Sequence, residues 1–430
     1  MAIPVAPLGT HPLLIFLLQV SLLLAAAVLL GRLAVRARMP ALVGELAAGV
    51  VLGPSILGAT LPGLSEWLIP QQPEQLHLLD AVGQLGVLLL VGLTGMHLDL
   101  GQLRRGGGVA AWVSAGGLVI PLALGVGVGL ALPAGVLPAD ADRPVFALFL
   151  GVAMCVSAIP VIAKTLWEMG LLHRDIGHLI MSSAIVDDVV GWLLLSVAAA
   201  MAAGSLGGVD VALAVGTVAL AVVVAVVLAR PLVGALLRRV GAGGEPGPTA
   251  ATVVVILLLF AAATHALRLE PVFGAFVGGL VVNSCAGLDR KALAPLRMVV
   301  MSVLAPLFFA TVGLRIDLTA LARPAVLGVA LLVLTVAIVG KFVGAYVGSR
   351  AARLGHWEGV ALGAGLNARG VIEVIVAMVG LRLGVLDTAM FTVIVLVAIV
   401  TSVMAPPCLR YAAARLPSSV QERRRAEVLS

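Results

Sequence analysis

Apolar runs of similar length recur along almost the whole chain, and they constrain its fold more than any other feature. A helix needs about 20 predominantly apolar residues to cross the hydrocarbon core of a bilayer. Thirteen runs approach that length, although the ninth is short: 12–33, 41–58, 78–97, 109–132, 145–166, 176–203, 211–228, 249–266, 272–285, 293–314, 325–347, 359–381 and 388–409. Charged residues make up 11% of the 430 positions, against about 25% in a soluble domain. The sequence therefore predicts an all-α polytopic membrane protein with about thirteen transmembrane helices.

Lys and Arg are distributed unequally between the two sides that these spans define. Alternate loops carry nineteen on one side and five on the other, and the remaining three of the 27 lie within spans. Cytoplasmic loops hold the excess of Lys and Arg in membrane proteins. We therefore expect a cell inner membrane protein with its N-terminus outside and its C-terminus in the cytoplasm. The same distribution accounts for the net charge of +6 without a nucleic-acid partner.

The chain also contains a short internal repeat. The third span ends in GMHLDL at 95–100 and the tenth in GLRIDL at 313–318, while AGVVL at 48–52 resembles GGLVV at 278–282. The matching segments lie seven spans apart, and because seven is odd the two copies enter the membrane from opposite sides. Inverted-topology repeats are typical of secondary transporters, whose sites lie near the bilayer midplane where the repeats meet.

Two spans separated by the same offset, the fifth and the twelfth, both look interrupted. Pro160 lies inside the fifth span, where it cannot donate to the helical ladder and disfavours helix just before it. Residues 363–370 of the twelfth span contain three glycines and Asn367, which weaken a helix. Paired interruptions in two halves indicate discontinuous helices around a transport site. The alternative is a simple kink in each span.

Three ionisable residues lie near the centres of spans, where a charge is unfavourable. Asp187 and Asp188 are adjacent in the sixth span, and Lys341 lies in the eleventh. A charged Asp at this depth costs about 2.5–3.5 kcal/mol on translocon scales, so two in a row need a reason. Successive helical residues point about 100° apart, so the two carboxylates face different partners. Lys341 is the expected ion-pair partner of the Asp pair, and purely structural ion pairing of both carboxylates is the alternative.

Further polar residues accompany these charges. Arg369 and Glu373 lie four residues apart on the twelfth span, a spacing that allows them to pair, and a purely structural salt bridge is the competing interpretation. Ser157, in the break of the fifth span, can offer its hydroxyl oxygen to a cation or bond its own backbone. Glu45 and His97 lie near the cytoplasmic ends of their spans, where a vestibule, a pH-sensing role and a solvated role are all open.

A buried carboxylate that water can reach binds either a proton or a hard monovalent cation such as Na⁺ or Li⁺. Competition for the same oxygens gives ion exchange without covalent chemistry, provided that the empty, charged site resists crossing. We therefore expect transport rather than enzymatic catalysis, with no cofactor beyond the transported Na⁺ and H⁺. A channel would need a continuous polar lining, and an intramembrane aspartyl protease needs its two Asp on different helices.

Three stretches resemble the monovalent cation:proton antiporter superfamily: VGELAAGVVLGPS at 43–55, SSAIVDD at 182–188 and NARGVIE at 367–373. An Asp pair combined with Lys341 is similar to the electrogenic NapA-type sodium/proton antiporters. The resemblance implies the NhaA/NapA-like antiporter fold, with Asp188 as the essential ion-binding carboxylate and Asp187 as the partner of Lys341. Na⁺ would then be held at Asp188 and Asp187, with Ser157 beside them. The supporting residues would be Arg369, Glu373 and Asn367.

The resemblance also implies a homodimer in which a mobile core moves against a fixed dimerisation domain. The dimerisation domain would comprise 1–105 and 206–320, the second part including a linker helix. The core ion-transport domain would comprise 106–205 and 321–415, and 416–430 would form a basic cytoplasmic tail. A K⁺/H⁺ antiporter on the same fold is the alternative function. His97 departs from the acidic residue that many relatives carry at its position.

Overall fold

The computed structural model describes residues 9–37, 39–69, 73–97, 100–133, 135, 137–138, 141–169, 171, 174–203, 208–241, 246–267, 269–285 and 290–416. Within these ranges every regular element is a helix, as the apolar runs predict. The longer helices are α1 (Thr10–Arg36), α4 (Pro73–His97), α5 (Leu100–Ala131), α8 (Asp175–Ala203), α9 (Gly208–Val224), α11 (Pro246–Ala266), α15 (Pro324–Ala351) and α18 (Thr388–Ala413). The shorter ones are α2 (Ala41–Leu52), α3 (Pro62–Leu68), α6 (Arg143–Cys155), α7 (Ile159–Glu168), α10 (Arg230–Gly241), α12 (Pro271–Ser284), α13 (Ala294–Val299), α14 (Ala305–Gly313), α16 (His356–Leu366) and α17 (Val371–Arg382).

By length and composition, fewer helices qualify as membrane-spanning than the thirteen or so that the sequence predicts. Among the described residues, ten helical segments are long and apolar enough to cross a membrane, and the bent pair α16–α17 makes an eleventh. Each predicted run nevertheless falls on a helix or on consecutive helices. The difference arises because α6 and α12 are short apolar helices of 13 and 14 residues. The count of about thirteen spans therefore stays a prediction.

Both interrupted spans are discontinuous helices in the structure. Residues 156–158 separate α6 from α7, and α16 and α17 meet at an angle of 47° across their break. The two breaks touch, since the backbone N–H of Ala158 donates to the carbonyl of Ala368 over 3.0 Å. This bond satisfies backbone groups that a helix would otherwise have paired, as non-helical backbone at membrane depth requires. A simple kink in each span is thus the wrong interpretation.

The repeated segments pack against one another in a matching way. An ideal Cβ on Gly49 of α2 would lie 2.0 Å from the carbonyl oxygen of Ala310 in α14, beside Gly313. In the other repeat, a Cβ on Gly279 of α12 would lie 2.1 Å from the carbonyl oxygen of Gly92 in α4. Real Cβ atoms do not come this close, so glycine is required at both positions. The same crossing of backbones therefore occurs twice, at residues that the repeat aligns.

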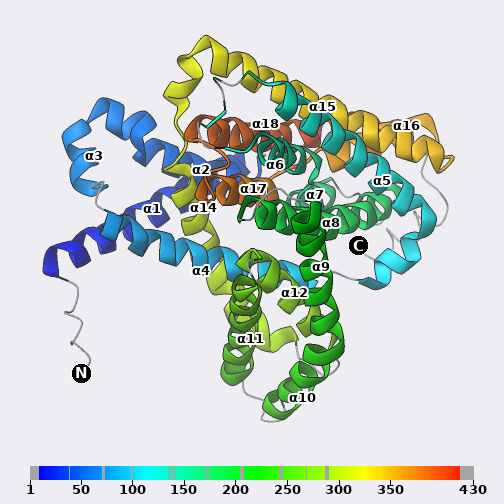
Figure 1. The fold of residues 1–430 in the computed structure, drawn as a ribbon, viewed down its shortest axis with the longest axis horizontal. Coiled ribbons are helices and arrows are strands. Elements are labelled where there is room, and N and C mark those ends of the chain that lie inside the picture. Colours follow the sequence, from blue (N-terminus) through cyan, green and yellow to red (C-terminus); the bar gives the residue numbers. More distant parts are fainter. Residues whose placement is uncertain are drawn as a thin grey trace.

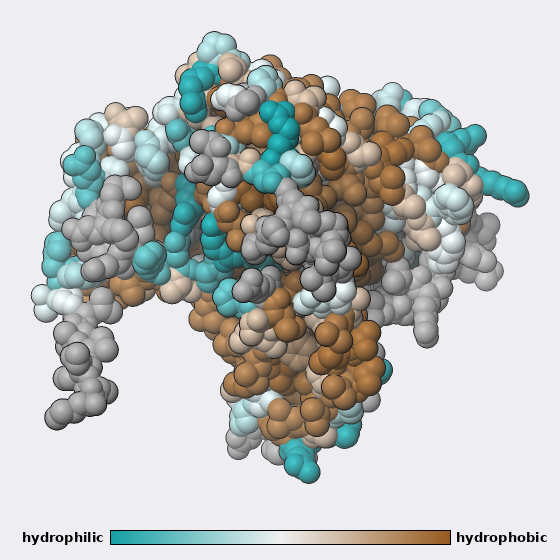
Figure 2. Space-filling view, in the orientation of Figure 1, coloured by the Kyte–Doolittle hydropathy of each residue, from teal (hydrophilic) through white to brown (hydrophobic). Residues whose placement is uncertain are grey.

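Helix α8 runs through the middle of the bundle and contacts α5, α6, α7, α16 and α17. Its neighbour across α5 is α15, which packs closely because Gly344 of α15 faces Gly116 of α5. In Figure 1, α10 and α11 project away from this bundle, while α1, α2 and α3 lie at the opposite side from α16. Hydrophobic residues cover much of the surface, including the projecting part around α11 (Figure 2). Exposed apolar helices of this length are typical of a multi-pass membrane protein.

Candidate ion-binding site

A fully buried ion pair lies at the centre of the bundle. Nζ of Lys341, on α15, lies 2.6 Å from Oδ2 of Asp187 on α8, and both side chains have no exposed surface. The same ammonium donates to the carbonyl oxygen of Cys155 over 2.5 Å. Cys155 is the last residue of α6, so its carbonyl belongs to the helix end at the break. The sequence-predicted partners are therefore in contact, and Lys341 also holds one of the discontinuous helices.

Ser157 links the ion pair to both breaks. Its hydroxyl oxygen lies 2.8 Å from Oδ2 of Asp187 and 2.8 Å from the carbonyl oxygen of Leu366, the last residue of α16. A hydroxyl has one proton to donate, so Ser157 bonds one of these acceptors at a time. Neither acceptor is a backbone group of the residues next to Ser157, so the alternative in which this serine only bonds its own backbone is wrong.

Asp188 differs from its neighbour because neither of its carboxylate oxygens bonds a side chain in the described part of the chain, and the backbone N–H of Ile159, at the start of α7, is the group within reach of the carboxylate. Its side chain is completely buried. Oδ1 of Asp187 and both polar atoms of the Asn367 amide are also buried without a hydrogen-bond partner among the described residues. Buried polar groups in proteins are almost always bonded. Among the described residues, the unsatisfied oxygens of Asp188, Asp187 and Asn367, together with Oε2 of Glu373, are therefore candidates to bind a proton or a small cation.

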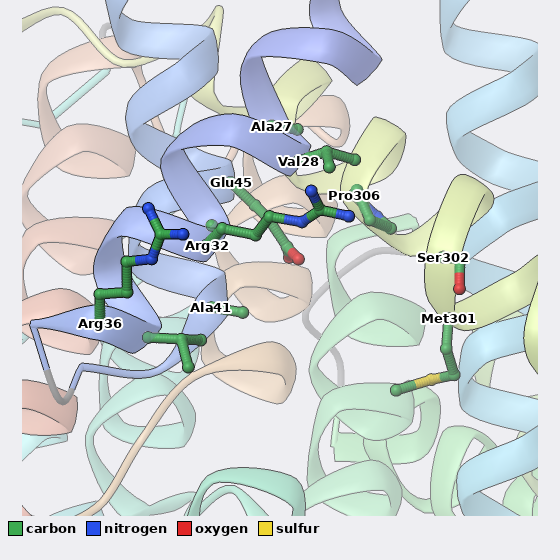
Figure 3. A pocket seen from close by; sticks show the side chains of 11 residues that line it. Ala27, Val28, Arg32, Arg36, Ala41, Glu45, Met301, Ser302 and Pro306 are labelled. Carbon is green, nitrogen blue, oxygen red and sulfur yellow. The ribbon is translucent and has the colours of Figure 1, made fainter.

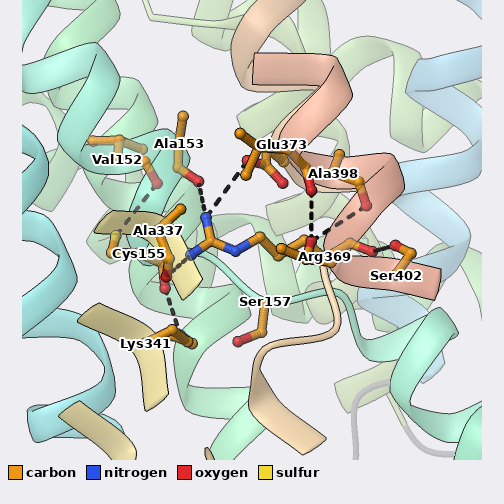
Figure 4. Close-up of polar contacts among 12 residues, drawn as sticks. Val152, Ala153, Cys155, Ser157, Ala337, Lys341, Arg369, Glu373, Ala398 and Ser402 are labelled. Atoms are coloured by element: carbon orange, nitrogen blue, oxygen red, sulfur yellow. Dashed lines mark hydrogen bonds and ion pairs between the residues drawn. The ribbon is translucent and has the colours of Figure 1, made fainter. Parts of the chain in front are cut away.

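Arg369 and Glu373 lie beside the breaks and contact more than each other. Figure 4 shows the guanidinium of Arg369 extending between Ala153, Ala337 and Glu373. Its Nη1 donates to the carbonyl of Ala153 over 2.9 Å and its Nη2 to that of Ala337 over 2.8 Å, whereas Glu373 Oε1 lies 3.5 Å away. The stronger bonds therefore join the second break to α6 and α15. Ser402 of α18 additionally donates to the backbone carbonyl of Arg369.

A second set of charges lies where α17 meets α12, α4 and α14. Arg382, the last residue of α17, lies 2.5 Å from Oε2 of Glu270, which precedes α12 and is almost completely buried. Nearby, Arg315 contacts both carboxylate oxygens of Asp80 at 2.7 and 2.6 Å. Arg382, Arg315 and Asp80 line one hollow of about 140 Å³ between these helices. Both arginines belong to the five Lys and Arg on the less basic side of the membrane, and the sequence predicts no partner for either.

The remaining predicted residues fall elsewhere. Glu45 is half-buried and lines a separate hollow beside α1. The side chain of His97 lies outside the described part of the structure. The groups that sequence reasoning missed are mainly backbone carbonyls, those of Cys155, Leu366 and Ala153. Only the position of the breaks could have signalled them, because a carbonyl group carries no residue identity.

The chain is similar to known membrane transport proteins over almost its whole length. A family model described as sodium/hydrogen exchanger, transmembrane, matches residues 21–413. The chain is 32% identical over 404 residues to the Na(+)/H(+) antiporter NhaS4 of Synechocystis sp., covering 93% of this chain and 97% of that protein. It is 32% identical over 397 residues to Cation/H(+) antiporter 19 of Arabidopsis thaliana, covering 91% of this chain and 49% of that protein. The chain thus spans about half the length of the plant relative.

A solved structure shares the fold. The sodium proton antiporter MjNhaP1 from Methanocaldococcus jannaschii superposes with a TM-score of 0.70, covering 94% of this chain and 99% of that one. The sequence identity is 17%, so this similarity concerns the fold alone. The antiporter fold that the sequence motifs imply is therefore confirmed.

Proposed function

Because this chain belongs to the family of sodium/hydrogen exchangers, we propose that it exchanges Na⁺ or Li⁺ for H⁺ by alternating access at Asp188. The observation that carries the proposal is a fully buried carboxylate with no side-chain bonding partner among the described residues, next to a buried ion pair and two touching helix breaks. A carboxylate in such a place stays neutral only by binding a proton or a cation. Competition between the two for the oxygens of Asp188 is the exchange reaction.

The oxygen atoms of the Asp pair and of the two helix breaks suit a small, hard cation. Carboxylate, hydroxyl, amide and backbone carbonyl oxygens are available from Asp188, Asp187, Ser157, Asn367 and Leu366. The Ser157 hydroxyl can donate to the carbonyl of Leu366 instead of Asp187. In that orientation the lone pairs of the hydroxyl oxygen can face an ion. The site then offers neutral oxygens beside carboxylates, as hard cations prefer.

Lys341 gives the exchange a second proton. A cation shared between Asp188 and Asp187 competes with Lys341 for the Asp187 carboxylate, which the ammonium contacts at 2.6 Å. An ammonium that loses its buried counter-ion is destabilised and releases its proton. One Na⁺ would then displace two protons, one from Asp188 and one from Lys341, so each cycle moves one net charge. At 100 mV that charge is worth about 2.3 kcal/mol.

We further propose the electrogenic NapA-type arrangement for the whole protein. In it, 106–205 and 321–415 form the moving core, and 1–105 and 206–320 form the fixed dimerisation domain of a homodimer in the inner membrane. The Lys and Arg distribution supports an outside N-terminus and a cytoplasmic C-terminus. The segments assigned to the core contain Asp187, Asp188, Lys341 and Arg369. This supports a movement in which the residues of the site stay together.

Reconstituted proteoliposomes test the function directly. Proton flux is measured with Na⁺, Li⁺ or K⁺ as the only monovalent metal cation, with and without an imposed membrane potential. The proposal predicts flux with Na⁺ and Li⁺ and acceleration by a potential that favours the net charge movement. Flux that is restricted to K⁺ would establish the K⁺/H⁺ alternative instead, and flux indifferent to potential would refute the two-proton exchange.

A further inference from the structure

An aromatic pair joins the segments that we assign to the moving core to those that we assign to the fixed domain. Trp192 of α8 belongs to the core segments and Phe276 of α12 to the fixed ones. Their ring centroids lie 5.6 Å apart at an interplanar angle of 32°, and both side chains are 1% exposed. Aromatic pairs at this distance attract each other beyond the burial of their surfaces. The contact therefore holds together two parts that the proposed mechanism moves apart.

Trp192 also lies beside the candidate ion-binding site. It follows Asp188 by four residues in the sequence, so the two side chains lie on one face of α8, about 6 Å apart along the helix axis. A long side chain in a helix points back towards the N-terminus and covers the preceding turn. In the proposed orientation α8 runs from the cytoplasm outwards, which places the indole on the outer side of the carboxylate. An ion that enters from outside along α8 would meet this ring before it reaches Asp188.

The indole N–H of Trp192 is buried, and it has no hydrogen-bond partner among the described residues. A buried Trp N–H usually has a partner, and the lack of one is unfavourable. Separation of the ring from Phe276 would admit water to this donor and satisfy it. The missing hydrogen bond therefore opposes the attraction between the rings, which brings the free energies of the packed and separated arrangements closer together.

Phe276 stands on a rigid part of the fixed segments. A Cβ on Gly95 of α4 would overlap the carbonyl oxygen of Phe276, so the backbones of α4 and α12 are in direct contact there. Six residues before Phe276, Glu270 pairs with Arg382 of α17, which belongs to the core segments. Helix α12 thus contacts the core at two depths: through an ion pair at its outer end, and through the aromatic pair about 9 Å further along its axis.

Two hollows differ in their relation to this boundary. The hollow of about 140 Å³ that Arg382 lines lies between α17 of the core and α4 and α14 of the fixed segments. Figure 3 shows a larger hollow of about 470 Å³, where Arg32 and Glu45 lie, and all of its lining residues belong to the fixed segments. Movement of the core away from the fixed domain would therefore widen the smaller hollow, on the outer side of the boundary.

We propose that Trp192 is the inner element of an outer gate, which closes Asp188 to the outside while the indole is packed on Phe276 and opens when the rings separate. The inference rests on the proposed exchange function and orientation, and Trp192 acts in it by position rather than by contact with the ion. Two substitutions should have opposite effects. Trp192→Phe keeps a ring on Phe276 and removes the unsatisfied donor, which favours the closed gate. Trp192→Ala removes the ring and favours the open gate.

Access to the site is measured with a cysteine in place of the central carboxylate. Asp188→Cys is combined with Cys285→Ser and Cys408→Ser, and a membrane-impermeant cationic thiol reagent is added outside right-side-out vesicles. The chain that carries only the two serine substitutions reports any labelling of Cys155, which is subtracted. Trp192→Ala should accelerate labelling from outside roughly ten-fold, and Trp192→Phe should slow it. Because the reporter chain lacks Asp188, its labelling rates do not depend on whether the protein exchanges Na⁺ for H⁺.

Two further variants separate a gate from a general loss of packing. Phe149→Ala is the matched control, because Phe149 is a fully buried aromatic residue of α6 that packs against Gly380 of α17, within the core segments. It should lower the unfolding temperature about as much as Trp192→Ala does and leave labelling from outside unchanged. Phe276→Leu, a milder change on the fixed side, should accelerate labelling in the same direction as Trp192→Ala.

Three results would overturn the proposal. The first is an unchanged rate of labelling from outside in both Trp192→Ala and Phe276→Leu. The second is acceleration by Phe149→Ala equal to that by Trp192→Ala, or acceleration by Trp192→Phe. The third is acceleration that occurs only when the reagent is added on the cytoplasmic side of inverted vesicles.

Discussion

Removing one member of the Lys341–Asp187 pair should destabilise the protein more than removing both. Among the described residues, Lys341→Gln leaves the buried Asp187 carboxylate with only the Ser157 hydroxyl as a donor. Asp187→Asn likewise leaves the ammonium with only the Cys155 carbonyl as a strong acceptor in the described part of the chain. Loss of one partner from a buried pair costs about 3–5 kcal/mol. Replacing both by neutral amides removes the uncompensated charge, so the double variant should recover about 2–3 kcal/mol of that loss.

The assay is thermal unfolding of the purified chain in detergent, arranged as a double-mutant cycle. An unfolding entropy of about 2.1 cal/mol/K per residue, applied to 430 residues, converts a loss of 4 kcal/mol into a fall of about 4 °C. Each single variant should therefore melt about 3–5 °C lower than the wild type, and the double variant closer to it. Additive losses, or single variants that melt like the wild type, would refute the buried-pair reasoning. Current measurements on Lys341→Gln liposomes provide a second readout, since the charge moved per cation should fall.

Two other predictions test the scaffold and its motion. Gly49→Ala and Gly279→Ala each place a Cβ about 2 Å from a backbone oxygen, so each should lower stability by roughly 1–3 kcal/mol in thermal unfolding. Gly127→Ala, where a Cβ meets nothing within 4 Å, is the control, and equal effects at all three positions would contradict the packing argument. Arg382→Gln should weaken the contact between α17 and Glu270. It should therefore increase the rate at which a thiol reagent labels cysteines introduced at the C-terminal end of α17. Unchanged labelling would show that this ion pair does not restrain the movement of α17.

Much of the fold follows from the sequence because the bilayer imposes it. Apolar runs identify the helices, and Pro160 together with the glycines around Asn367 identifies the breaks. The number of spans is harder to predict, since helices as short as α6 and α12 are buried by their neighbours and need not meet a length rule. The crossing of the two breaks through Ala158 and Ala368 depends on tertiary packing, which no local pattern encodes.

The contacts of the candidate site likewise include some that the sequence predicts and some that it does not. Lys341 could be paired in advance with the Asp187–Asp188 pair because opposite charges buried at one depth have few other partners, whereas the choice of Asp187 came from the family resemblance. Arg369 shows the limit of that reasoning, because its spacing from Glu373 indicates a simple ion pair. Its shorter bonds instead go to the carbonyls of Ala153 and Ala337. A long cationic side chain reaches whichever acceptors the neighbouring helices present, and those acceptors are backbone atoms without a sequence signature.

The most direct test of ion exchange at Asp188 is Na⁺-driven proton flux in proteoliposomes that contain Asp188→Asn. Flux should fall to the level of protein-free liposomes, because an amide cannot alternate between binding a proton and neutralising a cation. The variant should keep the unfolding temperature and oligomeric state of the wild type within the error of the measurement, since Asp188 bonds no side chain among the described residues and the amide oxygen of Asn can still accept from the backbone N–H of Ile159. Wild-type Na⁺/H⁺ exchange by the folded variant would contradict the account.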